Sequence, residues 1–379
     1  MNLHEESRPL VVVGAGPAGL CAAMEAAGAG LPPLVLDEGS QGGGQLVKQI
    51  HRFFGSREHG AGKRGFEIAV ELVSGCLEGG AEIRLGHRVL GFFRDGRLLV
   101  DGGEGVFLLR PGATILATGA VERSFPFPGW TLPGVMGAGA AQTLVNLHGV
   151  LPGKRALMVG AGNVGLIVAY QLLQAGMEVA GVIEVSRRVG GYLVHAERLR
   201  REGVPLFLRH RVVAAEGGKE VESVLVEDME TGALKRFLVD TLCLAVGMAP
   251  QAELAAMRGC RLVHVPELGG FLPWHDREMR TDHPGVYVAG DLAGVEEASV
   301  AMDEGRLAGL AAARDAGVLD PGKAAARMRE IGARLELLRG GPFGEPRRRA
   351  KERLCSLPGS ARGREDGDRV RRKGRLKKR

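Results

Sequence analysis

The sequence is poor in aromatic residues and has no paired cysteines. Phenylalanine, tryptophan and tyrosine make up 4% of its 379 residues. The five cysteines are scattered, and no two of them form a C-x-x-C, so we expect neither a redox dithiol nor a metal site. An odd, scattered set of cysteines is typical of proteins from a reducing compartment.

Long apolar runs are also lacking, and we do not expect the first residues to be a signal peptide. The first ten residues, MNLHEESRPL, are polar and acidic, which differs from a secretory signal peptide. No uninterrupted apolar stretch is long enough to cross a bilayer. These absences predict a cytoplasmic protein without a membrane span.

A net positive charge is found only at one end of the chain. The net charge is +6, but residues 345–379 alone carry 15 basic and 5 acidic side chains, so the remainder is acidic overall. We predict a helical extension over residues 321–341 and a basic, disordered tail over residues 342–379. A solvated tail explains this composition, and we do not expect a nucleic acid partner.

Glycine, by contrast, is abundant, and it marks two copies of one motif. Residues 10–19 read LVVVGAGPAG and residues 156–165 read ALMVGAGNVG, each a G-x-G-x-x-G between a strand-like and a helix-like run. The first glycine makes a tight turn, the second lets a pyrophosphate approach the backbone, and the third lets the helix pack against the strand. The helix N-terminus then favours a phosphate. The residues assigned to these two sites are Gly14, Gly16, Pro17, Ala18 and Gly19 in the first copy and Gly160, Gly162, Asn163, Val164 and Gly165 in the second.

An acidic residue follows each motif at the end of the next expected strand. Glu38 and Glu184 each lie 24 residues after the first glycine of their motif. Dinucleotide folds place an acid near this spacing, where it accepts hydrogen bonds from the adenosine ribose. In the first copy Asp37 is the alternative, and we favour Glu38.

The order of elements is also repeated. Residues 114–119, TILATG, and residues 241–247, TLCLAVG, return as buried strands after short strands separated by turns. This internal repeat predicts an α/β fold of two Rossmann-like domains, each with a parallel sheet and an antiparallel meander, one inserted in the other. We expect the first domain at residues 1–124 and 242–320 and the inserted domain at residues 125–241.

These motifs resemble the two-dinucleotide flavoprotein superfamily that includes thioredoxin reductase. The matching stretches are GAGPAGL, GGQL, ATG, GAGNVGL and YVAGD, in that order. The resemblance implies that the first domain holds FAD, with the late Asp at its phosphate–ribityl region, and that the inserted domain holds NAD(H) or NADP(H). It also implies that the helix after this Asp directs its N-terminus at the flavin pyrimidine ring. The further residues carried over are Gly44, Gln45, Thr118, Gly119, Gly290, Asp291 and Ala298.

One departure from thioredoxin reductase is decisive. Those enzymes carry a C-x-x-C in the inserted domain, where residues 132–149 here contain no cysteine. We therefore do not expect a disulfide reductase. Residues 117–144 instead resemble the FAD-containing α-type subunits of opine, D-hydroxyproline and sarcosine oxidising enzymes and the hydrogen cyanide synthase B subunit. That resemblance implies that the partner is a second flavoprotein subunit; the cysteine-rich iron–sulfur segment of many members is not seen in this sequence.

Two functions are compatible with these features. In the first, an FAD-dependent oxidoreductase, or the FAD subunit of an amine or amino-acid dehydrogenase, moves hydride or electrons between flavin and NAD(H), an amine, or a partner subunit that serves as electron acceptor. In the second, a non-catalytic nucleotide-binding subunit supports a catalytic flavoprotein. No catalytic residue is assigned; His51, His59 and His275 are candidate proton carriers but are more often structural.

The choice of nicotinamide cofactor depends on a few charged residues. The carboxylate of Glu184 suits both ribose hydroxyls of NAD and would repel a 2′-phosphate. Arg187 and Arg188 favour the phosphate. We favour NAD(H), and loss of nicotinamide binding at this site remains an alternative.

Overall fold

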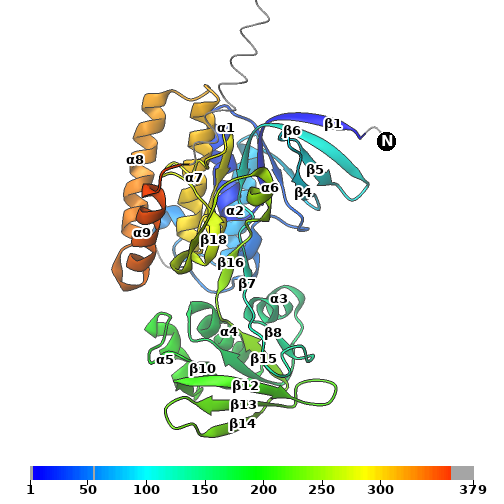
Figure 1. The fold of residues 1–379 in the computed structure, drawn as a ribbon, viewed down its shortest axis with the longest axis vertical. Helices are drawn as coiled ribbons and strands as arrows, with labels where there is room; N and C mark the ends of the chain where they lie inside the picture. The colour runs from blue at the N-terminus through cyan, green and yellow to red at the C-terminus, as the bar shows by residue number, and fades with distance from the viewer. Residues whose placement is uncertain (1–2, 54–55, 360–379) are drawn as a thin grey trace, which may run out of the picture. The chain divides into compact units, whose positions relative to one another are not determined.

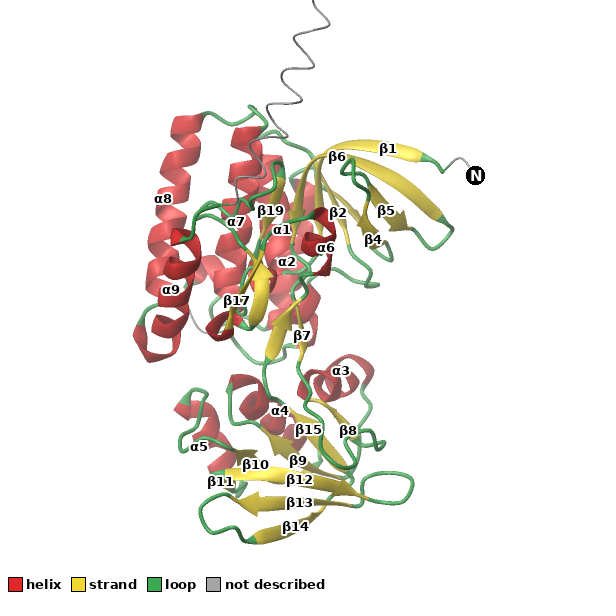
Figure 2. Cartoon of the chain, viewed as in Figure 1, coloured by secondary structure: helices red, strands yellow, loops and turns green. Residues whose placement is uncertain are grey.

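The protein divides into two compact units. The structure is a computed structural model that describes residues 3–53 and 56–359. Unit 1 consists of residues 1–121 and 249–379, and unit 2 of residues 122–248. Each unit has its own parallel sheet with helices packed on it, as Figure 2 shows. The predicted α/β class is confirmed by this topology.

The main sheet of unit 1 combines parallel strands with an antiparallel meander. Its strands are β1 (Glu5–Val13), β2 (Pro33–Leu36), β3 (Glu82–Arg84), β4 (Arg88–Phe92), β5 (Leu98–Asp101), β6 (Val106–Leu116) and β19 (Val286–Val288). The order is β3-β2-β1-β6-β5-β4, and β19 also pairs with β6 in parallel. Residues 10–13 of β1 are buried, which explains their unbroken apolar run, since a parallel strand is covered on both faces.

Unit 1 also contains six helices, short helical turns and a small hairpin in its described part. The helices are α1 (Pro17–Gly28), α2 (Gly65–Glu78), α6 (Glu253–Arg258), α7 (Ala298–Asp315), α8 (Pro321–Leu338) and α9 (Gly341–Ser356). The turns are η1 (Gly44–Lys48), η2 (Arg57–His59), η3 (Pro266–Leu268) and η4 (Gly290–Leu292), and the hairpin is β17 (Leu262–Val265) with β18 (Gly270–Pro273). Helices α1 and α7 pack on the sheet, α8 packs on α7, and α9 packs on the hairpin. Helix α7 contacts both α1 and α8 (Figure 1).

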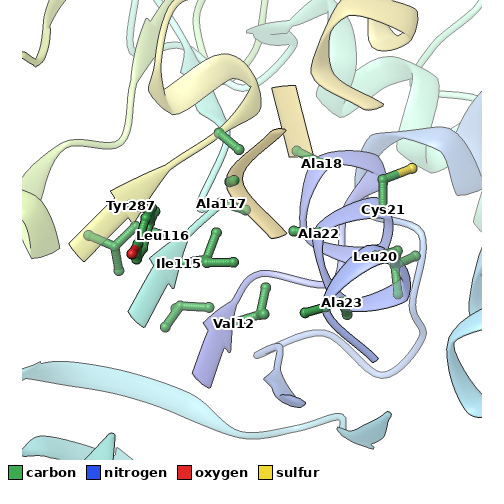
Figure 3. Packing of buried hydrophobic residues seen from close by; sticks show 14 of the residues in the cluster. Val12, Ala18, Leu20, Cys21, Ala22, Ala23, Ile115, Leu116, Ala117 and Tyr287 are labelled. Atoms are coloured by element: carbon green, nitrogen blue, oxygen red, sulfur yellow. The ribbon is translucent and has the colours of Figure 1, made fainter. Parts of the chain in front are cut away.

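Helices α1 and α7 are in unusually close contact. A Cβ atom at Gly305 would collide with the carbonyl oxygen of Ala18, and one at Gly309 with that of Ala22. Glycine on α7 therefore allows backbone to meet backbone. Figure 3 shows Ala18 and Ala22 on α1 among the buried residues around this contact.

The predicted disordered tail is wrong over its first part. Residues 342–356, expected to be disordered, belong to α9, whose Ala350 and Leu354 are buried against the β17–β18 hairpin and the adjacent Trp274. Composition alone misled the prediction, because two apolar residues one helical turn apart are enough to pack a basic helix. Residues 360–379 of the predicted tail lie outside the described residues.

Unit 2 repeats the parallel core of unit 1. Its sheet is β8 (Val135–Gly137), β9 (Arg155–Val159), β10 (Glu178–Glu184), β11 (Leu206–Leu208) and β15 (Thr241–Leu244), in the order β11-β10-β9-β15-β8. Helices α3 (Ala138–His148) and α4 (Asn163–Gln174) pack on it, and α5 (Leu193–Arg201) packs on α4. An antiparallel sheet follows, formed by β12 (His210–Glu216), β13 (Ser223–Asp228) and β14 (Leu234–Leu238).

One expected domain boundary is wrong. We expect the first domain to resume at residue 242, but β15 pairs with β9 and β8 in unit 2, and the chain returns to unit 1 at residue 249. Strand β15, the counterpart of residues 114–119, must complete the sheet of unit 2 before the chain returns to unit 1. The two connecting segments, β7 (Ala120–Glu122) and β16 (Met248–Pro250), pair with each other.

Among the residues that the structure describes, no helix is both long and apolar enough to cross a membrane.

The contact between α1 and α7 leads to a stability prediction. Gly305→Ala should lower the free energy of unfolding by about 1–3 kcal/mol, because the added methyl group collides with the Ala18 carbonyl. Gly332→Ala on α8 is the control: no atom lies within 4 Å of the new methyl, so the variant should gain about 0.5–1 kcal/mol from helix propensity. Urea unfolding measures both, and equal effects of the two substitutions would contradict the proposed contact.

Candidate functional site

The first glycine motif forms a tight turn between β1 and α1. Gly14 has φ of +107°, and a Cβ there would collide with the Ala117 carbonyl. A Cβ at Gly19 would collide with the carbonyl of Gly14. At Gly16 the nearest atom to an added Cβ is 4.0 Å away, on Gly44, so space stays open beside the start of α1. Two glycines are thus required by the turn, and the third leaves room for a ligand.

The second motif has the same geometry in unit 2. Gly160 has φ of +104°, and its Cβ would meet the Ala245 carbonyl. A Cβ at Gly165 would collide with Gly160, whereas nothing lies within 4 Å of one at Gly162. Helices α1 and α4 both begin without a side-chain cap, at Pro17 and Asn163 respectively. Each helix therefore begins directly after the glycine that has open space beside it, Gly16 or Gly162, and a helix N-terminus beside open space suits an anion.

The acidic residues at the strand ends hold these turns in place. Asp37 accepts hydrogen bonds from the backbone N–H groups of Ala15 (2.6 Å) and Gly39 (2.8 Å). Glu184 accepts from those of Ala161 and Ser186, both at 2.8 Å. Asp37 is therefore the structural counterpart of Glu184.

Glu38, which the sequence favours, has a different environment. Its side chain is exposed and accepts a hydrogen bond from Arg88 Nε at 2.7 Å. The spacing of 24 residues is not equivalent in the two copies, because β10 contains a bulge between Val179 and Gly181 that lengthens the second copy by one residue.

A second loop of unit 2 was missed from the sequence. Residues 37–46, DEGSQGGGQL, and residues 184–193, EVSRRVGGYL, both place a glycine pair six residues after the acid. Gly43 N donates to Ala15 O at 2.7 Å, and Gly190 N donates to Ala161 O at 3.0 Å. The glycine pair six residues after each acid could have identified this loop of unit 2 from the sequence. Gly44 and the exposed Gln45 thus have counterparts in Gly191 and Tyr192.

The glycine pairs lie directly on the turns. A Cβ at Gly44 would lie 2.8 Å from Gly16 Cα, and one at Gly191 would lie 2.8 Å from Asn163 N. The backbone N–H of Tyr192 also donates to Asn163 Oδ1 at 2.8 Å. The neighbouring Val164, the second residue of α4, is exposed.

The late Gly-Asp pair joins the first motif in unit 1. A Cβ at Gly290 would lie 2.7 Å from Ala18 Cβ, which places η4 against the start of α1. Asp291 is half-buried and accepts a hydrogen bond from Glu296 N at 3.3 Å. Burial, with nearby Glu304 and Glu296, raises the pKa of Asp291 to about 7. Helix α7 begins at Ala298, so its N-terminus follows this turn.

Thr118 and Gly119 complete the surroundings of the first turn. They follow Ala117, which touches Gly14. Thr118 Oγ1 donates to Gln251 O at 2.8 Å, and Gln251 N donates to Gly119 O at 3.0 Å. Residues far apart in the sequence are thus brought together at one end of the sheet of unit 1.

The candidate proton carriers have protein partners. His59 is buried, with Nε2 3.1 Å from Asp303 and Nδ1 2.8 Å from Ser56. His275 is also buried, and burial together with nearby Lys351 lowers its pKa to about 3, so it is neutral. His51 stacks on Phe53 with ring centroids 5.3 Å apart. No group of three or more metal-ligating side chains occurs among the described residues.

The cysteines are not arranged for redox chemistry. All five are free thiols, and Cys355 is half-buried while the other four are buried. Burial raises the pKa of Cys76 and of Cys243 to about 12. A thiol must ionise to act as a nucleophile, so these two are inert at neutral pH.

Comparison with known proteins identifies the family. Residues 8–305 match the family described as pyridine nucleotide-disulphide oxidoreductase. The chain belongs to this family. The predicted membership of a flavoprotein oxidoreductase family is thus confirmed.

Two relatives within this family share about a third of the residues. Hydrogen cyanide synthase subunit HcnB of Pseudomonas aeruginosa is 32% identical, over 89% of this chain and 77% of that protein. An opine oxidase subunit of Agrobacterium tumefaciens is 34% identical, over 81% of this chain and 65% of that protein. The chain therefore spans slightly less than two thirds of the opine oxidase protein.

Two solved structures share the fold. Thioredoxin reductase of T. acidophilum superposes with a TM-score of 0.68 at 24% identity, covering 82% of this chain and 98% of that one. L-proline dehydrogenase of P. horikoshii superposes with a TM-score of 0.69 at 24% identity, covering 87% of this chain and 60% of that one. At this identity the likeness concerns the fold alone.

The geometry of the strand-end acids leads to a second prediction. Asp37→Ala should lower the free energy of unfolding by about 1–3 kcal/mol, because it removes the acceptor of two backbone N–H groups. Glu38→Ala is the matched control and should change stability by less than about 1 kcal/mol, because it removes one exposed ion pair. Chemical unfolding of both variants checks this, and a larger loss for Glu38→Ala would contradict the assignment.

Proposed function

We propose that this protein is an FAD-dependent oxidoreductase that binds FAD in unit 1 and NAD(H) in unit 2. The observation that carries the proposal is the open space beside Gly16 at the start of α1, bordered by Gly44; two residues on, Ala18 lies against Gly290 of η4, which also lies beside Ala301 in the first turn of α7. The N-termini of α1 and α7, together with the carboxylate of Asp291 in η4, suit a ligand that has both phosphate and hydroxyl groups. FAD, when bound, supplies the capacity to accept and release a hydride.

The residues of unit 1 fit this cofactor. The N–H groups at the start of α1 would bind the pyrophosphate, and Asp37 rather than Glu38 would accept hydrogen bonds from the adenosine ribose. Asp291 would accept a hydrogen bond from the ribityl chain, and the N-terminus of α7 near Ala298 would stabilise negative charge on the pyrimidine ring. Gln45, Thr118 and Gly119 would line the same site.

In unit 2 we propose NAD(H) rather than NADP(H). Both oxygens of Glu184 already accept backbone N–H groups, which fixes the carboxylate at the strand end where the ribose of NAD(H) would bind. A 2′-phosphate would be repelled by this carboxylate. Arg187 and Arg188 are exposed on the loop that follows and have no comparable fixed position in the described structure.

The names of the relatives support an amine or amino acid as the substrate. They are called subunits of opine oxidase, hydrogen cyanide synthase and sarcosine oxidase. We therefore propose that this chain has a second subunit for its partner, which would exchange electrons with the flavin of this chain. Disulfide reduction is not proposed, because residues 132–149 contain no cysteine.

A pair of glycine variants tests cofactor assignment. The purified wild-type protein should show flavin absorbance that bleaches on anaerobic addition of NADH. Gly16→Val should be colourless yet folded, because its side chain enters only the open space. Gly162→Val should retain the flavin but lose its reduction by NADH. Full flavin occupancy in Gly16→Val would refute the site, and flavin that no nicotinamide cofactor or amine reduces would favour the non-catalytic subunit.

The nicotinamide preference is tested by stopped-flow reduction. NADH should reduce the flavin faster than NADPH at equal concentration. Glu184→Gln should narrow this difference by about tenfold, since it removes the charge that repels the 2′-phosphate, and tenfold corresponds to 1.4 kcal/mol. Glu197→Gln, an exposed substitution on α5, is the control and should leave the ratio unchanged. Faster reduction by NADPH in the wild-type protein would overturn the assignment.

A further inference from the structure

Helix α9 places a lysine in the interior of unit 1. The side chain of Lys351 is only 5% exposed. Its Nζ donates to Glu304 Oε1 at 2.6 Å and to Ala293 O at 2.9 Å, and it lies 3.3 Å from His275 Nε2. His275 is neutral, with Nδ1 2.9 Å from Asp276 O and Nε2 3.3 Å from Ala293 O; in the tautomer that donates from Nδ1, Nε2 accepts from Lys351. An ammonium group has three protons, and here each has an acceptor.

A second buried cation joins the same cluster. Arg339, at the C-terminal cap of α8, donates to Glu304 Oε1 at 2.6 Å and forms a two-pronged contact with Glu296 at 2.6 and 2.9 Å. Both cations therefore share one oxygen of Glu304. The other oxygen, Oε2, is buried and has no hydrogen-bond partner among the described residues. Glu304 thus depends on α8 and α9 for its stabilisation.

The carbonyl that Lys351 contacts belongs to the Gly-Asp turn. Ala293 N donates to Gly290 O at 2.7 Å, and Gly294 N donates to Asp291 O at 3.2 Å. Lys351 therefore fixes the end of the turn that carries Asp291. Glu296, which Arg339 holds, donates its backbone N–H to the Asp291 carboxylate.

Other contacts dock α9 independently of this lysine. Ala350 and Leu354 are buried in an apolar cluster with Trp274. Trp274 Nε1 donates to Leu357 O at 3.1 Å, and Arg261 donates to Pro358 O at 2.8 Å. Loss of the Lys351 charge therefore leaves the apolar docking surface of α9 intact.

We propose that α9 is part of the flavin site and that Lys351 is a positioning residue, which holds the Gly290–Asp291 turn and balances the carboxylates around it. The inference rests on the proposed binding of FAD in unit 1. It assigns a role to a helix that lies beyond the region matched by the family, which ends at residue 305.

The charge balance has a consequence for pH dependence. Asp291 has Glu296 and Glu297, which directly precede α7, and Glu304 of α7 as neighbouring acids, and Glu304 pairs with Arg339 of α8 and Lys351 of α9. The pKa of Asp291 is already raised to about 7, so its carboxyl loses a proton near neutrality. Removing a cation from this set favours the protonated acid and raises that pKa further. The pH at which FAD affinity changes should therefore move upward when Lys351 is neutralised.

The test measures FAD binding to apoprotein between pH 6 and 9. Lys351→Met should weaken binding on the order of tenfold at pH 7 and move the midpoint of the pH profile up by about one pH unit. Arg353→Met, on the exposed side of the same helix, is the matched control and should change neither. Trp274 fluorescence of the apoproteins reports whether α9 remains docked, and it should be the same in all variants.

A double variant separates charge balance from simple structural support. Lys351→Met with Glu304→Gln removes both partners, so it should recover most of the affinity and the wild-type pH midpoint, as expected when a buried pair is removed together. A double variant as weak as Lys351→Met would overturn the charge-balance role. Unchanged affinity and pH profile in Lys351→Met would overturn this inference alone. If the wild-type protein takes up no FAD, the proposed function fails and the inference fails with it.

Discussion

The close contact between α1 and α7 is the constraint on which unit 1 depends. Because Gly305 and Gly309 have no side chain, the two helices meet backbone to backbone at Ala18 and Ala22. This brings Gly290 against Ala18, and thus the η4 turn to the start of α1. A larger residue on either helix would force the two N-termini apart. Helix α8 packs on α7 in turn, so the position of the C-terminal helices also follows from this contact.

Unit 2 uses the same parts in a different chain order. In unit 1, residues 284–290 read PGVYVAG and lead from β19 into α7, after the rest of the sheet has formed. In unit 2, residues 133–139 read PGVMGAG and lead from β8 into α3, before the glycine motif. β19 pairs with β6 as β8 pairs with β15, and α7 packs on α1 as α3 packs on α4. The second copy is therefore a circular permutation of the first.

The two glycine turns and the fold class were predictable from the sequence because they depend on local geometry. The turns at Gly14 and Gly160 are set by a few adjacent residues, so the motifs gave their position and the fold class directly. The choice between Asp37 and Glu38 was not local, because it depends on a bulge in the strand of the other copy. The order of domains was predicted, but the return point at residue 249 depends on which sheet takes β15. Helix α9 was missed because its packing depends on Ala350, Leu354 and a lysine whose acceptors lie 47 to 76 residues away.

The buried charges at the end of α8 and in α9 are not explained by stability alone. Taking Lys351, Arg339, Glu304 and Glu296 out of water costs several kcal/mol per ion, and their mutual attraction offsets this only with near-ideal geometry. Apolar residues of similar volume would pack α9 at no such cost, as Ala350 and Leu354 already do. A charged cluster retained at this position therefore needs another reason. Its contact with the Ala293 carbonyl, two residues after Asp291, supplies one, because only a charged donor can both hold that turn and compensate the acids beside it.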